Sequence, residues 1–169
     1  LEPDRPVWLH EVGAPAPHVP AEQAAEFARA TIGNALDCPD VWGVTWWCSH
    51  DVDRALADFP ELEYSLGLLT NDGAPKPGGL AIAALAEETR RAWTPPPPRT
   101  TARVLDLPEH PRKRSACAPG GAFFEAYMAL VERGERPAVV RAQHANDDAY
   151  LSARGITSVR WTLEDAPHS

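Results

Sequence analysis

Residues 6–13, PVWLHEVG, constrain the fold more than any other segment of this chain. Their aliphatic and aromatic side chains favour a strand and do not alternate with polar ones, which is typical of a parallel strand covered on both faces. The run ends in a carboxylate, Glu11, and then breaks at Gly13. Burying a charge is costly, so a carboxylate at the end of such a strand predicts a functional role there.

A second segment, residues 41–51 with the sequence VWGVTWWCSHD, has the same design. Between the two segments, apolar residues at i, i+3 and i+4 spacing predict a helix over residues 21–36. A strand–helix–strand unit of this kind forms a right-handed crossover between parallel strands. Two strands that both end in polar residues predict an α/β barrel with its site at the carboxyl ends of the strands.

About 29 residues connect Cys48 to the next helix, which is predicted over residues 78–93. A connection of this length is uncommon unless it is functional. It contains an extended piece over Tyr64–Leu69 and a turn at Asn71–Gly73. We therefore expect the long loop to contribute to the site.

The four prolines at 95–98 predict a stiff spacer between two domains. We assign residues 1–94 to the last two strand–helix units of a barrel, residues 95–101 to a linker and residues 102–169 to a small accessory domain. Its predicted order is βαβαβ, with strands at 102–107, 137–142 and 157–162, a helix at 120–133 that ends at Gly134, and a helix that begins at the cap Asp147.

Strand alternation predicts which side chains share a face. On the first strand, Glu11 shares a face with Leu9 and Val7, and Trp8 and His10 point the other way. On the second strand, Trp47 shares a face with Gly43 and Thr45, whereas Trp42 and Trp46 point toward the helices. Glu11 and Trp47 are then expected over one pocket. A carboxylate beside an indole is suited to a sugar ring, whose C–H face stacks on the aromatic ring.

His50 and Asp51 follow the second strand, where they are placed to hydrogen-bond substrate hydroxyl groups. The alternative is a local turn in which the Asp51 side chain caps the next segment. His10, His50, Asp51 and Asp53 lack the spacing of a metal site, so no metal is predicted.

Composition excludes several classes of function. The net charge of −8 argues against a nucleic acid partner, which requires a basic surface. The three cysteines form no CxxC pair, so they indicate neither zinc nor a disulfide framework, and they favour a reducing compartment such as the cytoplasm. No apolar run is long enough to predict a membrane span.

The segments WLHEVG, WGVTWWCSHD and LGLLTNDGAPKP, in this order, resemble the last two units of a retaining (β/α)8 glycosidase of glycoside hydrolase family 5. The resemblance covers about residues 5–93 and is to the β-mannosidase-type branch. It implies hydrolysis of β-linked mannosides or related β-1,4-glycans without cofactor or metal, with Glu11 as the nucleophile. It also implies that a tryptophan stacks under the sugar; this residue maps best to Trp47, with adjacent Trp46 as the second candidate.

One departure from the family pattern limits this prediction. Retaining hydrolysis needs two carboxyl groups about 5–5.5 Å apart, and the family's acid/base follows an asparagine, but no Asn-Glu pair occurs here. The chain begins at Leu1 and enters a strand within a few residues, so we expect it to be the C-terminal part of a longer protein, inactive without the upstream acid/base.

Two other functions stay open at this point. The chain could be a non-catalytic carbohydrate-binding or scaffold protein with a degenerate barrel. Alternatively, residues 99–169 could be an autonomous α/β module that mediates oligomer contacts. An upstream Asn-Glu pair would favour the enzyme, and association of residues 99–169 alone would favour the module.

Overall fold

The computed structural model describes residues 5–16, 18–107 and 115–161. The chain divides between Pro96 and Pro97 into two compact units, each described below by itself.

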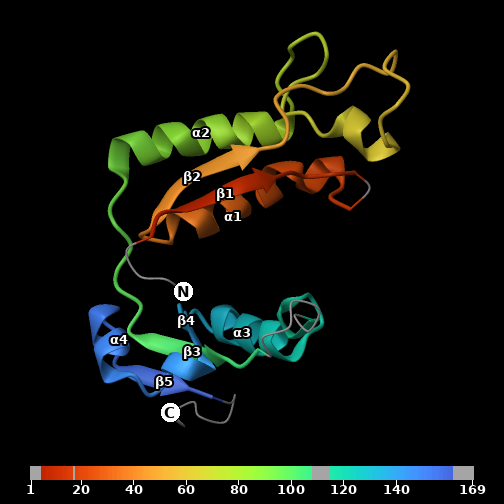
Figure 1. Ribbon diagram of the computed structural model, residues 1–169. Coiled ribbons are helices and arrows are strands. Elements are labelled where there is room, and N and C mark those ends of the chain that lie inside the picture. The colour runs from red at the N-terminus through yellow and green to blue at the C-terminus, as the bar shows by residue number, and fades with distance from the viewer. Residues whose placement is uncertain (1–4, 17, 108–114, 162–169) are drawn as a thin grey trace. The chain divides into compact units, whose positions relative to one another are not determined.

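The first unit is a parallel two-stranded sheet with two long helices (Figure 1). Its elements are β1 (Val7–Val12), a 3-10 turn (Ala21–Gln23), α1 (Ala24–Leu36), β2 (Val41–Trp46), the 3-10 helix η2 (Glu61–Ser65) and α2 (Pro77–Ala92). The two helices pack on each other, and α1 buries the small residues Ala28 and Ala35. An exposed ion pair between Arg29 and Glu88 (2.7 Å) also joins them, and such a pair contributes little stability.

The strand register corrects the predicted faces of β1. Trp8 pairs with Gly43 and Leu9 with Val44, but Val12 pairs with Trp46, so β1 carries one extra residue between Leu9 and Val12. Such a bulge moves the following side chains to the other face of the strand.

Trp8 was predicted to point away from the face that carries Glu11 and Thr45, and this prediction is wrong. The indole Nε1 of Trp8 donates to Thr45 Oγ1 at 2.8 Å, which places both side chains on one face. A Cβ on Gly43 would lie 3.3 Å from the same indole ring, so Trp8 also covers this glycine. Because of the bulge beyond Leu9, we expect the Glu11 side chain on the same face of the sheet as Trp8 and Thr45.

The connection between β2 and α2 also differs from the prediction. Tyr64 and Ser65 belong to η2 instead of an extended piece, because the Glu63 N–H donates to the Pro60 carbonyl (2.9 Å) and closes a turn. Extended structure is limited to Leu69, which forms isolated bridges with His50 and Pro75.

The second unit is an open α/β layer with three parallel strands in the order β4-β3-β5. Its elements are β3 (Thr101–Leu105), a 3-10 turn (Ser115–Cys117), α3 (Ala122–Glu132), β4 (Ala138–Arg141), a 3-10 turn (Ala142–His144), α4 (Asp148–Ala153) and β5 (Ser158–Arg160). The predicted alternation of strands and helices is confirmed. The central strand β3 is buried from Ala102 to Leu105 and forms the core with Ala138, Val140 and Ile156.

Two predicted helix boundaries in this unit are confirmed. Gly134 follows α3 with φ +78°, a conformation that glycine adopts without steric cost, and its N–H donates to the Val131 carbonyl (2.8 Å). Asp147 caps α4, since its Oδ1 accepts from the Tyr150 N–H at 3.0 Å.

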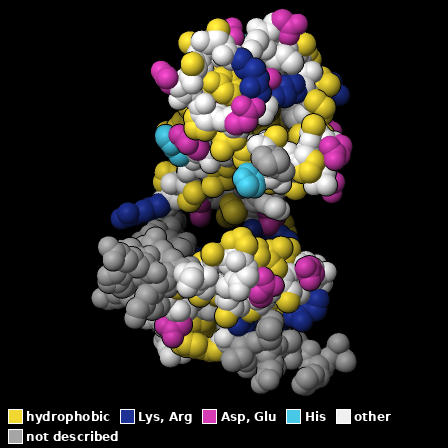
Figure 2. All heavy atoms as spheres, turned by 90° about the vertical axis from the view of Figure 1, so that its right-hand side faces the viewer, with side chains coloured by type: hydrophobic (Ala, Val, Ile, Leu, Met, Phe, Trp, Pro, Cys, Tyr) yellow, Lys and Arg dark blue, Asp and Glu magenta, His cyan; other side chains and the backbone are white. Residues whose placement is uncertain are grey.

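The surface of the chain carries both signs of charge. On the face that Figure 2 shows, acidic and basic side chains are interspersed with apolar and neutral ones. Within the described part of the chain, none of the helices combines the length and the apolar character needed to cross a bilayer.

Leu130 and Val131 on α3 provide a matched test of the second unit. Leu130 is 2% exposed and Val131 is 40% exposed. We expect Leu130→Ala to lower the free energy of unfolding by about 2–5 kcal/mol because it leaves a cavity. Val131→Ala should cost less than about 1 kcal/mol. Urea denaturation followed by circular dichroism measures both, and equal losses would show that Leu130 is not a core residue.

Candidate active site at the strand ends

The carboxyl ends of β1 and β2 lie against each other. The Trp47 N–H, one residue beyond β2, donates to the Val12 carbonyl at 2.7 Å. A Cβ on Gly13 would lie only 2.8 Å from the Trp47 carbonyl oxygen, so the two backbones could not approach in this way with a larger residue at position 13. The structure therefore brings the end of the strand that carries Glu11 next to Trp47. Glu11 is exposed.

Trp46 and Trp47 lie in different environments. The Trp46 ring contacts Phe27 of α1, with centroids 6.4 Å apart and planes at 75°, as predicted for a side chain that packs toward the helices. Trp42, which was predicted to pack in the same way, is 74% exposed and contacts the Trp8 ring edge-on. Trp47 is 47% exposed, which leaves ring surface available to a ligand.

The indole of Trp47 is held from one side by a carboxylate. Its Nε1 donates to Glu63 Oε2 at 3.2 Å, and Glu63 lies on η2, sixteen residues further along the chain. The peptide bond that follows Trp47 is cis. Glu63 was not predicted from the sequence, because no periodic pattern links a residue in an irregular loop to the end of a strand.

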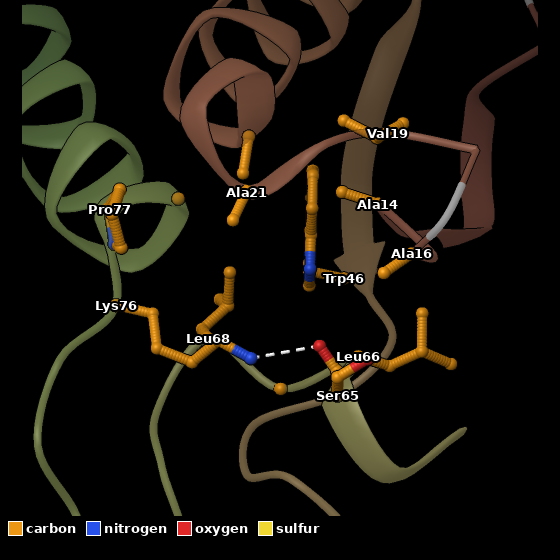
Figure 3. A pocket seen from close by; sticks show the side chains of 13 residues that line it. Ala14, Ala16, Val19, Ala21, Trp46, Ser65, Leu66, Leu68, Lys76 and Pro77 are labelled. Carbon is orange, nitrogen blue, oxygen red and sulfur yellow. Dashed lines mark hydrogen bonds between the residues drawn. The ribbon is translucent and has the colours of Figure 1, made fainter. Parts of the chain in front are cut away.

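Asp51 ties the loop to the start of α2. Its Oδ1 accepts from Lys76 Nζ at 2.7 Å and from the Gly67 N–H at 2.9 Å. Lys76 also donates to the Ser65 carbonyl at 2.8 Å, the contact drawn in Figure 3. Both described hydrogen bonds of the Asp51 side chain are thus internal. Neither partner lies in the segment that directly follows Asp51, so these bonds are not the predicted local cap, and the role in binding substrate hydroxyl groups stays a prediction.

His50 is exposed beside this network. Its Nδ1 lies 3.2 Å from Ser49 Oγ, and its carbonyl accepts from the Cys48 thiol at 2.9 Å. The ring is accessible to a ligand, so its predicted role in hydroxyl binding stays a prediction. Across the residues that the structure describes, no group of three or more His, Cys, Asp and Glu side chains could hold a metal ion.

A cavity of about 270 Å³ lies behind the strand ends, on the Trp46 side (Figure 3). Apolar residues such as Val19, Leu66 and Leu68 line most of it. The buried Nε1 of Trp46 has no hydrogen-bond partner among the described residues. The lining of this cavity includes neither Glu11 nor Trp47, so we do not assign it to the candidate active site.

Fold and site together define a class of protein. Parallel strand–helix units with a functional edge at the strand ends are typical of α/β barrels, and a strand-end carboxylate beside an accessible indole is typical of enzymes that act on carbohydrates.

Comparison with solved structures agrees with this class. Residues covering 97% of the chain match the GH5_18 protein of Streptomyces cattleya at 63% identity and a TM-score of 0.89. That protein was crystallised as a glutamate-to-alanine variant with Manβ1-4GlcNAc. A second structure of that protein contains GlcNAc. The GH5_18 protein of Bifidobacterium longum subsp. longum matches 99% of the chain at 41% identity and a TM-score of 0.85. No family model and no curated relative matches.

The chain belongs to glycoside hydrolase family 5, and the solved structures that it matches here are those of GH5_18 proteins. It spans about 40% of the length of these solved chains.

Gly67 is required by the backbone around the site. A Cβ at this position would lie 2.2 Å from both the Asp51 nitrogen and the His50 carbonyl carbon. We expect Gly67→Ala to displace the loop and to lower the melting temperature measured by differential scanning calorimetry. Gly33→Ala is the control, because Gly33 lies inside α1 with no atom within 4 Å of its added Cβ. There alanine should stabilise the helix by about 0.5–1 kcal/mol. A loss no greater for Gly67→Ala than for the control would contradict the tight packing.

Cys48 supplies a pH-dependent test of the same region. Its partial burial raises the pKa of the thiol, and the nearby carboxylates of Glu63 and Asp51 raise this pKa further. A raised pKa lowers the fraction of reactive thiolate at any given pH. We therefore expect the pH profile of Cys48 alkylation by iodoacetamide to lie at higher pH in the folded protein than in urea. Coincident profiles would show that neither burial nor the carboxylates act on the thiol.

Proposed function

We propose that this chain carries the nucleophile and the sugar platform of a retaining β-glycosidase that hydrolyses Manβ1-4GlcNAc or a closely related β-linked mannoside. The observation that carries the proposal is the exposed Glu11 at the end of β1, beside the half-exposed Trp47. The similarity to proteins captured with this disaccharide supports the choice of substrate.

Glu11 is proposed to act as a nucleophile in two displacements. Its carboxylate attacks the anomeric carbon, the bond to the leaving-group oxygen breaks, and a second carboxylic acid protonates that oxygen. The product is a glycosyl ester on Glu11. Water then attacks the same carbon and gives its proton to the second carboxylate, so that free sugar leaves and Glu11 is regenerated.

Trp47 is proposed to form the floor under the reacting sugar. A flat aromatic surface fits the flattened ring of an oxocarbenium-like transition state, and the ring's π-electrons attract the positive charge that develops on it. The contact therefore strengthens in the transition state, where it lowers the barrier.

The second carboxylic acid is proposed to come from outside the 169 residues. The sequence has no Asn-Glu pair, and the chain spans only part of the length of the enzymes that it resembles. On this proposal, the 169 residues alone do not hydrolyse the substrate. The rest of the barrel supplies the acid/base and completes the pocket.

Glu11→Gln tests the assignment of the nucleophile. In the full-length enzyme that the proposal implies, we expect hydrolysis of Manβ1-4GlcNAc to fall by about a thousandfold or more, because an amide cannot attack the anomeric carbon. A chimera that carries residues 5–161 in place of the matching segment of the Streptomyces cattleya protein provides a second reagent. Glu26→Gln on the exposed face of α1 is the matched control, with unchanged activity.

Covalent labelling provides an independent measurement. A 2-fluoro-mannosyl inactivator should attach to Glu11, as detected by peptide mass spectrometry. Label on a different carboxylate would refute the proposed role. If neither the full-length protein nor the chimera hydrolyses the disaccharide but both bind it, the non-catalytic carbohydrate-binding alternative is the correct one.

A further inference from the structure

We propose that Glu63 is a positioning residue that acts through Trp47, holding the indole ring in place under the sugar. This inference deepens the proposed function and rests on the role that it gives to Trp47.

The Trp47 side chain needs an external constraint. It lies one residue beyond the end of β2 and is 47% exposed, so packing covers only about half of it. The described hydrogen bond of its indole is the one from Nε1 to Glu63 Oε2, at 3.2 Å. A hydrogen bond to an ionised carboxylate is stronger than one between neutral groups. This bond therefore selects one orientation of the ring among those that the open site permits.

Glu63 is itself held by the turn that carries it. The Glu63 N–H donates to the Pro60 carbonyl at 2.9 Å, which closes the first turn of η2. At the end of the same helix, the Ser65 carbonyl accepts from Lys76 Nζ at 2.8 Å. The carboxylate thus extends from a segment that is fixed on both sides of it.

Arg54 makes further contacts with η2. Its guanidinium pairs with Glu61 at 2.6 Å and lies over the Tyr64 ring, 4.9 Å from the centroid. The Tyr64 hydroxyl donates to the Leu56 carbonyl at 2.6 Å. These contacts join the flanking residues of Glu63 to the preceding loop. Glu61, the other carboxylate in the first turn of η2, is engaged by Arg54. The indole of Trp47 donates to Glu63.

A contact that fixes the ring should affect the chemical step. A displacement of about 1 Å in a positioning group can lower the rate up to about a hundredfold. Because stacking strengthens in the transition state, the loss should appear mainly in kcat. Glutamine keeps an oxygen acceptor at the same place, and leucine removes it while filling a similar volume.

The test is a double-mutant cycle in the full-length enzyme, with kcat expressed per site titrated by the fluorosugar. We expect Glu63→Leu to lower kcat by about tenfold to a hundredfold and Glu63→Gln to remain within about threefold of the unmodified enzyme. In a Trp47→Phe background, which lacks the indole N–H, Glu63→Leu should cause no further loss. Asp58→Leu, at an exposed position of the same loop, is the control with unchanged kcat.

Several outcomes overturn the inference. If Glu63→Leu lowers kcat equally with and without the indole N–H, the residue has only a structural role. If Glu63→Gln is as impaired as Glu63→Leu, or if Glu63→Leu matches the unmodified enzyme, the hydrogen bond does not position the ring. Failure of the proposed function is distinct, since Glu11→Gln would then leave hydrolysis and labelling unchanged.

Discussion

The ion pair between Asp51 and Lys76 holds the long loop beside the strand ends. It joins the segment just beyond β2 to the start of α2, and the chain between them has little regular structure. The side chains are 16% and 27% exposed, so solvent screens their attraction less than that of the surface pairs. Removing one partner from such a partly buried pair leaves the other charge uncompensated. The second bond of Lys76, to the Ser65 carbonyl, then fixes the end of η2.

The candidate site thus combines two kinds of support. Strand β1 places Glu11 at the edge of the sheet. The hydrogen bond from the Trp47 N–H to the Val12 carbonyl places Trp47 at the same edge. The orientation of the indole depends on the irregular loop, through Glu63. Regular structure sets where the groups are, and the loop sets which way the aromatic ring faces. A site on loops is precise only when those loops are themselves braced.

The sequence predicted the elements of both units better than their details. Apolar spacing and caps such as Asp147 and Gly134 are local signals, so the helices and their ends could be located. The bulge between Leu9 and Val12 has no local signal, and strict alternation carried across it assigned Trp8 to the wrong face. The contact between Trp47 and Glu63 depends on how a long loop folds back, which residue spacing does not encode. Glu11 and Trp47 were predicted from the sequence because the carboxyl ends of barrel strands are where functional side chains concentrate.

The two-stranded sheet has a consequence for how this protein behaves outside its folded state. In the part of the chain that the structure describes, β1 and β2 pair only with each other, so each presents one outer edge of backbone amides and carbonyls. Val7 and Trp8 are about half exposed beside these edges. Open apolar edges are templates for pairing with other chains. Whenever no further strands cover these edges, either during synthesis or after proteolysis, aggregation is expected to start from this sheet.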